Sequence, residues 1–77
     1  MIKEEIKEVM SNVFEIEINT IHDDASQKTI ASWDSLQHLN LMVELEEKFD
    51  LSFEPEEIGN MTSLALIIQT IEKMKHD

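Results

Sequence analysis

The chain has 77 residues, which suits one domain close to the smallest size at which a single hydrophobic core is stable. It contains no cysteine, which excludes disulfides and thiolate metal sites and favours a reducing compartment, so we expect a cytoplasmic protein. Its 17 acidic residues outnumber its 6 basic residues and give a formal net charge of −11. That charge disfavours nucleic acid and anionic lipid as partners and favours proteins with basic patches, although a merely well-solvated surface would also account for it.

The composition also favours a helical protein that does not insert into a membrane. One glycine and one proline are too few for a turn-rich β fold. Met1 to Glu5 lack the apolar segment of a signal peptide, and no stretch of the sequence approaches the length that spans a bilayer. We therefore expect a single domain over residues 1–77.

The first predicted helix runs from about Lys3 to about Phe14. Apolar residues recur there at helical spacing, and charged residues fall on the opposite side, so one face is expected to pack on the core. The apolar residues are Ile2, Ile6, Val9, Met10, Val13 and Phe14.

A long connection is expected from Glu15 to Asp34. Glu15–Ile18 alternates polar and apolar residues, but no second alternating stretch exists to pair with it as a strand. A connection of this length in a small domain either is functional or contains an unassigned element, and a brief helical turn around Asn19–Ile21 would shorten it. The stretch His22–Lys28 is polar and expected to be exposed. The isoleucines expected to reach the core are Ile16, Ile18, Ile21 and Ile30.

The second predicted helix runs from about Ser35 to about Phe49. Asp34 stands at its N-cap position, where a carboxylate can accept a first-turn backbone N–H and complement the helix dipole. A short third helix, from Pro55 to about Ile58, is expected to end in a left-handed conformation at Gly59-Asn60.

Thr62 or Ser63 is expected to cap a fourth helix that ends near Lys75. Its apolar residues are Leu64, Ile67, Ile68, Ile71 and Met74. The expected fold is therefore all-α: a small four-helix bundle of three main helices and a short third helix, with a long loop between the first two. The last residues, His76-Asp77, are expected to fray.

The second helix carries two apolar stripes when its residues are placed about 100° apart on a helical wheel. The first stripe contains Leu41, Met42, Leu45 and Phe49, with His38 among them. The second contains Leu36, Leu39 and Val43, with Glu46 and Glu47 at its borders. Both stripes could be buried, because a central helix of a bundle touches several neighbours. Alternatively, the second stripe is a docking surface for a partner with an apolar slot and a basic rim.

Ser35 is the candidate for chemistry, although a catalytic role is disfavoured. A nucleophilic serine needs a base and an oxyanion site; His38 lies three residues on, but no glycine-rich turn accompanies it. Ser35 could also simply help to cap the helix. No metal site is expected, because His22-Asp23-Asp24 lacks the calcium-loop spacing.

Three segments of the sequence resemble the acyl carrier proteins. They are Trp33–Leu36, which contains Asp-Ser-Leu, Leu45–Asp50, which contains Leu-Glu-Glu-x-Phe, and Met61–Leu64, which opens the last helix. The resemblance extends over essentially the whole chain in length, helix order and acidity. Asp-Ser-Leu by itself is a weak signal, whereas its position at the start of an acidic amphipathic helix, with the later segments at matching distances, is specific.

The resemblance implies that a phosphopantetheinyl transferase attaches 4′-phosphopantetheine from coenzyme A to Ser35, between Asp34 and Leu36. The arm would supply the thiol that this cysteine-free chain lacks and would carry acyl or aminoacyl groups as thioesters, for fatty acid, polyketide, peptide or related biosynthesis. The protein itself would be a monomer without catalytic residues. Its partners would be loading enzymes, acyltransferases and synthases with basic docking patches. The partner-binding residues implied are Leu36, Leu39, Val43, Glu46 and Glu47.

The sequence departs from the fatty-acid carriers at three positions. Trp33 stands where a small or aliphatic residue is common, Asn40 replaces an acidic residue, and His38 adds a titratable group. These departures favour a specialised carrier for a secondary-metabolite, polysaccharide or aminoacyl pathway. The competing interpretation is an unmodified acidic helical module that binds a basic or apolar partner through the second helix.

Overall fold

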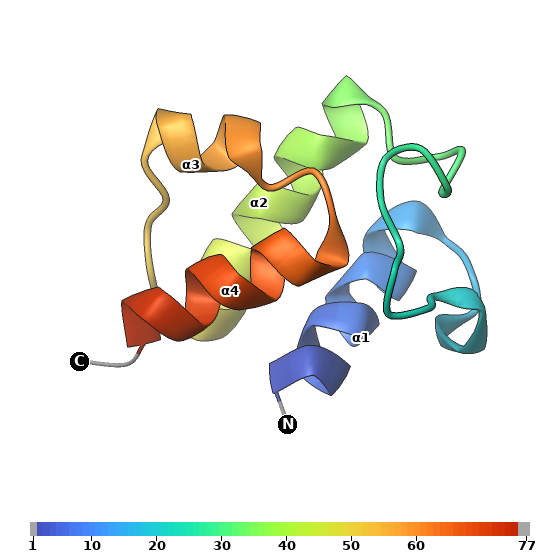
Figure 1. Cartoon of the computed structure of the whole chain (residues 1–77), viewed down its shortest axis with the longest axis horizontal. Coiled ribbons are helices and arrows are strands. Elements are labelled where there is room, and N and C mark those ends of the chain that lie inside the picture. Colours follow the sequence, from blue (N-terminus) through green and yellow to red (C-terminus); the bar gives the residue numbers. More distant parts are fainter. Residues whose placement is uncertain (1, 76–77) are drawn as a thin grey trace.

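A computed structural model describes residues 2–75 of the chain. It contains the helices α1 (Ile2–Phe14), α2 (Ser35–Phe49), α3 (Pro55–Asn60) and α4 (Leu64–Lys75), and a 3₁₀ turn, η1 (Ile18–Thr20). Figure 1 shows α4 crossing in front of α2, with α1 beside them and α3 above α4. Residues 2–75 contain no strand, which confirms the all-α prediction. His76 and Asp77, which were expected to fray, lie outside the described residues.

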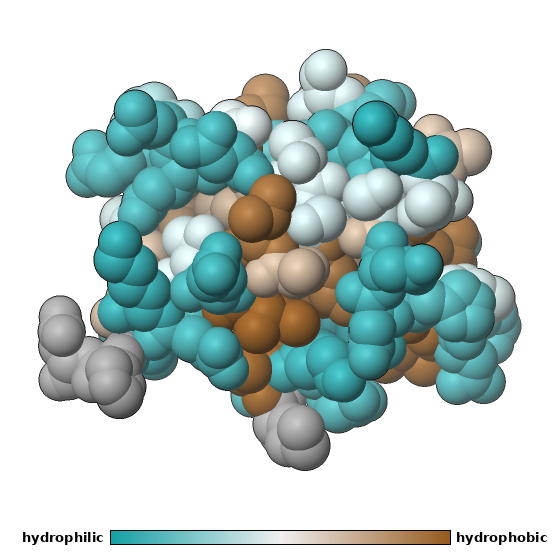
Figure 2. All heavy atoms as spheres, viewed as in Figure 1, coloured by the Kyte–Doolittle hydropathy of each residue, from teal (hydrophilic) through white to brown (hydrophobic). Residues whose placement is uncertain are grey.

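The hydrophobic core lies where α1 packs against α2 and α4. It is one continuous cluster, to which each fully buried aliphatic side chain contributes about 1.5 to 3 kcal/mol. The face drawn in Figure 2 is largely hydrophilic, and hydrophobic atoms gather near its middle, where α4 and α1 meet. The side chains with less than 2% of their surface exposed are Ile6, Met10, Leu41, Met42, Leu45, Met61, Leu64, Ile67 and Ile71.

The two apolar stripes of α2 have different environments. The first stripe is buried in the core together with His38, as the wheel predicts. The second stripe, Leu36, Leu39 and Val43, is exposed to solvent. The interpretation in which both stripes are buried is therefore wrong. The reason is that α1 and α4 cover only one side of α2, and the short α3 does not extend over the other.

The connection between α1 and α2 is more firmly attached than its polar sequence indicates. The helical turn is present as η1, and Ile21 and Ile30 are buried. However, Ala25 is buried too, so the prediction that His22–Lys28 is exposed is wrong at that residue. The carbonyl of Ala25 accepts a 2.9 Å hydrogen bond from the N–H of Leu64. That N–H belongs to the first turn of α4 and has no partner within its own helix, so the connection supplies one.

The end of α3 also differs from the prediction. The helix continues through Gly59 to Asn60, and the residue after it, Met61, has a φ of −84°. Met61 donates its N–H to the carbonyl of Glu57, so the chain leaves α3 without a left-handed residue and places a buried methionine in the core. Left-handed residues instead follow α1 and α2, at Glu15 and Asp50.

At the start of α4, the cap is Ser63 rather than Thr62. The Ser63 hydroxyl accepts a 3.2 Å hydrogen bond from the N–H of Leu66. None of the helices within residues 2–75 combines the length and the apolarity needed to cross a membrane.

Two lysines of α1 hold the connection electrostatically. Lys7 and Lys3 place their Nζ atoms 3.0 and 3.2 Å from the carboxylate oxygens of Asp23. The hydrogen bond from Lys7, followed by that from Lys3, lowers the pKa of Asp23 below its ordinary value of 3.8. A carboxyl group whose native pKa is depressed stabilises the fold above its unfolded pKa and loses that contribution as the pH falls through the native pKa.

Asp23→Asn should therefore lower the melting temperature slightly at neutral pH, because the charged hydrogen bonds to the lysines are lost. The difference from wild type should shrink as the pH falls from neutral through the lowered native pKa of Asp23, where the wild-type carboxyl also becomes protonated. Thermal unfolding followed by circular dichroism across this pH range measures the effect. Asp24→Asn, at the exposed neighbouring carboxylate, is the matched control. An equal loss in both variants would contradict the specific role of Asp23.

Candidate functional site

Ser35 is the first residue of α2 and is exposed to solvent. Asp34 caps this helix as predicted: its Oδ1 accepts a 2.9 Å hydrogen bond from the N–H of Gln37, and its backbone carbonyl accepts one of 2.8 Å from the N–H of His38. A capping bond of this kind is worth about 1 kcal/mol. The cap begins the helix at Ser35 and thereby presents the serine hydroxyl at a helix N-terminus.

The electrostatics at Ser35 favour an anionic substituent. A helix N-terminus carries a partial positive charge, because its first backbone N–H groups have no partners within the helix. The first turn of α2 contains no acidic residue, so only the Asp34 cap opposes that field. Phosphate groups are commonly bound in this environment. An exposed hydroxyl that carries a phosphodiester is therefore chemically compatible with this position.

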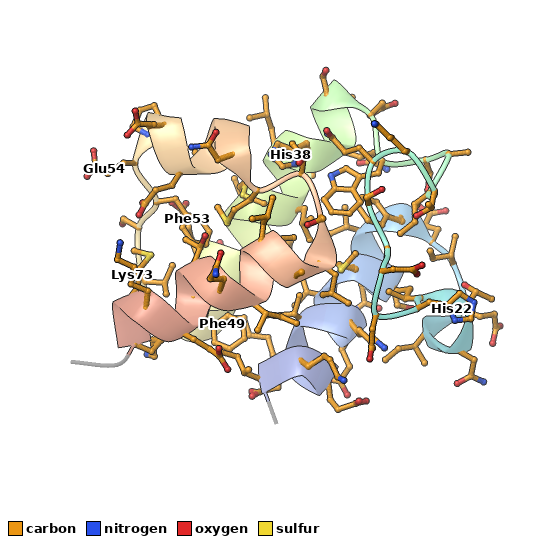
Figure 3. The ribbon with its side chains drawn as sticks, in the orientation of Figure 1. His22, His38, Phe49, Phe53, Glu54 and Lys73 are labelled. Carbon is orange, nitrogen blue, oxygen red and sulfur yellow. The ribbon has the colours of Figure 1, made fainter. Side chains whose placement is uncertain are left out.

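His38 is not available to Ser35 as a base. Its Nδ1 accepts a 2.9 Å hydrogen bond from the indole N–H of Trp33, and its Nε2 lies 2.7 Å from the carbonyl oxygen of Ile58. The imidazole is 8% exposed. Figure 3 shows His38 between α3 and the connection, on the inner side of α2. Both ring nitrogens are thus engaged, which argues against nucleophilic catalysis by Ser35.

The second stripe of α2 forms an apolar strip on the surface that begins beside Ser35. Leu36, Leu39 and Val43, together called the recognition stripe here, are 68%, 54% and 52% exposed. Large apolar side chains gathered on one helix face and bordered by charge are typical of protein–protein contacts.

The two carboxylates predicted at the border of the recognition stripe have different environments. Glu47 is exposed, whereas Glu46 is half-buried. The Oε2 of Glu46 accepts a 2.7 Å hydrogen bond from the backbone N–H of Phe53, in the segment that leads to α3. Glu46 therefore stabilises the fold, whatever else it contacts. Sequence reasoning missed this role because nothing local links Glu46 to a residue seven positions away in an irregular segment.

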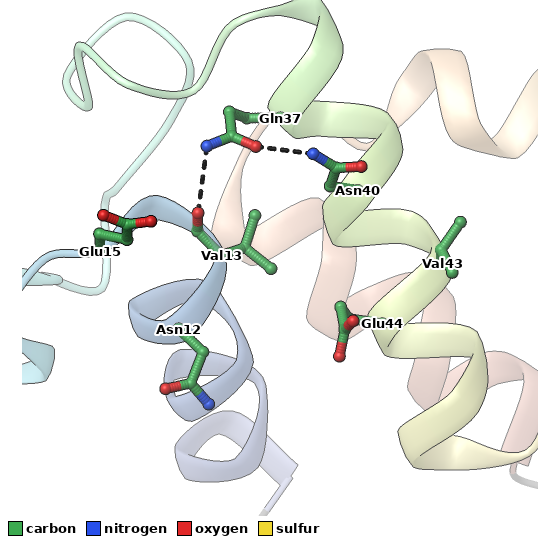
Figure 4. Close-up of a pocket in the computed structure, with 7 residues that line it drawn as sticks. All are labelled: Asn12, Val13, Glu15, Gln37, Asn40, Val43 and Glu44. Atoms are coloured by element: carbon green, nitrogen blue, oxygen red, sulfur yellow. Dashed lines mark hydrogen bonds between the residues drawn. The ribbon is translucent and has the colours of Figure 1, made fainter.

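A pair of amides joins α2 to the end of α1. Asn40 donates a 2.8 Å hydrogen bond to the side-chain oxygen of Gln37, and Gln37 donates one of 3.1 Å to the carbonyl of Val13 (Figure 4). That carbonyl is in the last turn of α1, where helical partners end. The amides border an open hollow of about 440 Å³. Its lining residues are Asn12, Val13, Glu15, Gln37, Asn40, Val43 and Glu44.

The polar loop His22-Asp23-Asp24 is the remaining candidate from the sequence. Asp23 is bound by the two lysines of α1, and the described part of the chain contains no cluster of three histidine, aspartate or glutamate side chains that could hold a metal ion. His22 lies at the edge of the molecule far from His38 (Figure 3).

Comparison of the sequence with protein-family models and with curated proteins finds no match. Among solved structures, 52 chains match. One is a protein of Mycobacterium tuberculosis described as a candidate acyl carrier protein, with a TM-score of 0.86 and 18% sequence identity over 96% of this chain and 99% of that chain. At that identity the likeness establishes the fold alone. The chain therefore has the fold of an acyl carrier protein.

The hydrogen bond between Glu46 and Phe53 has a consequence for stability. Glu46→Ala should destabilise the protein by about 1 to 2 kcal/mol, because it leaves a partly buried N–H without its charged acceptor. Glu47→Ala, at the exposed neighbour, should change the free energy of unfolding by less than about 0.5 kcal/mol. Urea denaturation of both variants measures the difference. Equal stabilities would show that the Phe53 N–H gains nothing from Glu46.

Proposed function

We propose that the protein is an acyl or aminoacyl carrier that is modified with 4′-phosphopantetheine on Ser35. The observation that carries the proposal is the exposed Ser35 hydroxyl at the capped N-terminus of α2, within the fold of an acyl carrier protein. Asp34 and Leu36 flank the attachment point. The carrier does no catalysis itself; it presents its cargo to enzymes.

The composition of this chain is consistent with a thiol that is supplied by a prosthetic group rather than by a side chain. It contains no cysteine, so it has no side chain that forms a thioester. The prosthetic group would supply a thiol on a long arm and so carry an acyl group as a thioester. The protein's part is to offer an accessible hydroxyl to the transferase and a helix N-terminus that favours the resulting phosphodiester.

The recognition stripe is the proposed docking surface for the enzymes that load and unload the arm. Leu36, Leu39 and Val43 would enter an apolar slot, while Glu47 and, with its second oxygen, Glu46 would face a basic rim. Such a rim would also be attracted by the net charge of −11, which raises the rate of encounter with a positively charged patch. The partners are a phosphopantetheinyl transferase, loading enzymes, and acyltransferases or synthases.

The residues that depart from fatty-acid carriers make hydrogen bonds within this chain. Asn40 donates to Gln37, which a carboxylate at that position could not do, and Trp33 and His38 are bonded to each other in the interior. These residues serve the fold of this particular chain. We propose in addition, from the resemblance in sequence, that the protein is a specialised, monomeric, cytoplasmic carrier formed by residues 1–77 as one domain.

A second candidate function is an unmodified acidic interaction module. The exposure of the recognition stripe favours it equally, because a docking surface needs no prosthetic group. The two functions differ in a single covalent event at Ser35.

The purified chain should gain the mass of one phosphopantetheine when it is incubated with coenzyme A, magnesium and a broad-specificity phosphopantetheinyl transferase. Intact-protein mass spectrometry measures the gain. Ser35→Ala should abolish the gain, while Ser32→Ala, in the preceding loop, should leave it unchanged. If a known carrier is fully converted in parallel and this chain is not, the unmodified module is the better description.

Leu39→Ala combined with Val43→Ala should raise the KM of the transferase for the carrier about tenfold or more, since the pair lies at the centre of the proposed docking surface, where truncations that cost more than about 1 kcal/mol are concentrated. The free energy of unfolding should change little, because both side chains are already exposed. Leu66→Ala is the matched control, an exposed leucine on α4. A similar rise in KM for the control would show that the recognition stripe is not the docking surface.

A further inference from the structure

A chain of two buried hydrogen bonds joins the segment before Ser35 to α3. It runs from the indole N–H of Trp33 to His38 Nδ1 over 2.9 Å, and from His38 Nε2 to the carbonyl of Ile58 over 2.7 Å. The sequence separations are 5 and 20 residues. Thus one imidazole contacts the residue that precedes the cap of α2 and the middle of α3.

Only one assignment of donors and acceptors is consistent with these two hydrogen bonds. An indole nitrogen can only donate, so His38 Nδ1 must accept. The imidazole therefore carries its hydrogen on Nε2 and donates it to the carbonyl of Ile58. That carbonyl lies near the end of a helix of six residues, where helical partners are few. The Ile58 carbonyl also accepts a 3.4 Å hydrogen bond from the N–H of Met61, so every polar atom of this hydrogen-bonded series has at least one partner.

The rings around His38 leave little freedom for alternative arrangements. Trp33 is 3% exposed and stacks on His38, with ring centroids 6.1 Å apart and planes inclined by 24°. Phe14 of α1 packs on the indole ring of Trp33, and their ring centroids are 5.3 Å apart. The backbone is also tied, because the N–H of His38 bonds to the carbonyl of Asp34 and the N–H of Trp33 to that of Ile30. Movement of Trp33 would therefore displace the cap that begins α2.

Apolar side chains could fill the space that Trp33 and His38 occupy, so their polar atoms are not needed for packing alone. A phenylalanine and a leucine would occupy similar space without a buried donor that needs an acceptor. A satisfied polar pair instead selects one arrangement, since every alternative leaves a buried polar group unpaired at a cost of about 1 to 3 kcal/mol. The arrangement selected here places the Ser35 end of α2 and α3 in a fixed relation.

We propose that His38 is a positioning residue for transfer onto Ser35: its Nδ1 holds Trp33 and hence the cap before Ser35, whereas its Nε2–H ties α3 to α2 without acting on the serine. This inference rests on the proposed function, because it concerns the presentation of Ser35 to the transferase. It adds that an interior residue, which touches neither the hydroxyl nor the partner, sets how well the serine is presented.

Two substitutions of His38 separate its hydrogen bond with Trp33 from its hydrogen bond with Ile58. In His38→Gln the side-chain amide can reach the position of Nε2 and donate to Ile58, but it leaves Trp33 without an acceptor. In His38→Asn the shorter amide oxygen can take the position of Nδ1 and accept from Trp33, but it does not reach Ile58. Trp33→Phe removes the indole donor and retains the aromatic ring.

His38→Gln and Trp33→Phe should each raise the KM of a phosphopantetheinyl transferase for the carrier about three- to tenfold, as expected for one hydrogen bond, and leave kcat within about twofold. The double variant should be no worse than either single variant, because both remove the same bond. His38→Asn should keep KM within about twofold of wild type. In that variant hydrogen exchange at the amide of Met61, which caps the end of α3, should be faster because α3 has lost its hydrogen bond to His38.

The single tryptophan provides a readout that does not depend on activity. The indole N–H signal of Trp33 in a ¹⁵N-labelled sample should shift and exchange faster in His38→Gln, and should stay near its wild-type position in His38→Asn. His22→Gln, at the distant exposed histidine, is the control for both measurements. Equal KM values for His38→Gln and wild type would overturn the inference and leave the proposed function intact. The same follows if the rise in KM of the double variant His38→Gln/Trp33→Phe equals the product of the two single rises. If the wild-type chain itself is not modified, the proposed function fails, and this inference fails with it.

Discussion

The burial of one face of α2 is the constraint on which the rest of this structure depends. Side chains of a helix are fixed at about 100° from one another, so placing Leu41, Leu45 and Phe49 in the core decides where every other residue of the helix points. The recognition stripe is then turned toward solvent, and Ser35 is exposed at the end of the helix. The burial of one face of α2 thus fixes both the core contacts of the helix and the residues that it exposes, including Ser35.

So small a core leaves much of the remaining order to polar contacts between irregular segments. The carbonyl of Ala25 binds the start of α4, the carboxylate of Glu46 binds the N–H of Phe53, and the amide of Gln37 binds the end of α1. Each contact satisfies a backbone group that secondary structure leaves unpaired. They join the long connection to α4, the segment before α3 to α2, and the end of α1 to α2. Because several of these residues lie next to the recognition stripe, the same side chains that stabilise the fold also limit how the surface can be altered.

Sequence reasoning succeeded where the physics is local. The bounds of α2, its Asp34 cap, its two stripes and the turn at η1 all follow from spacing and from the chemistry of adjacent residues. It failed where the outcome depends on a distant partner. Ala25 was assigned to an exposed loop because its neighbours are polar, yet α4 requires an acceptor there. A left-handed residue was expected at Gly59, but bonds from Met61 continue the helix past it.

The amino-acid sequence by itself determined a helical, acidic, cysteine-free chain with a serine at a capped helix start, because composition, periodicity and capping act over a few residues. Tertiary structure alone decided which apolar stripe stays exposed, that Glu46 serves the segment before α3, and that His38 bonds Trp33 and Ile58 rather than assisting Ser35. These outcomes depend on which surfaces the other helices cover and on which unpaired backbone groups come within reach. No spacing along the chain encodes that information until the helices have packed.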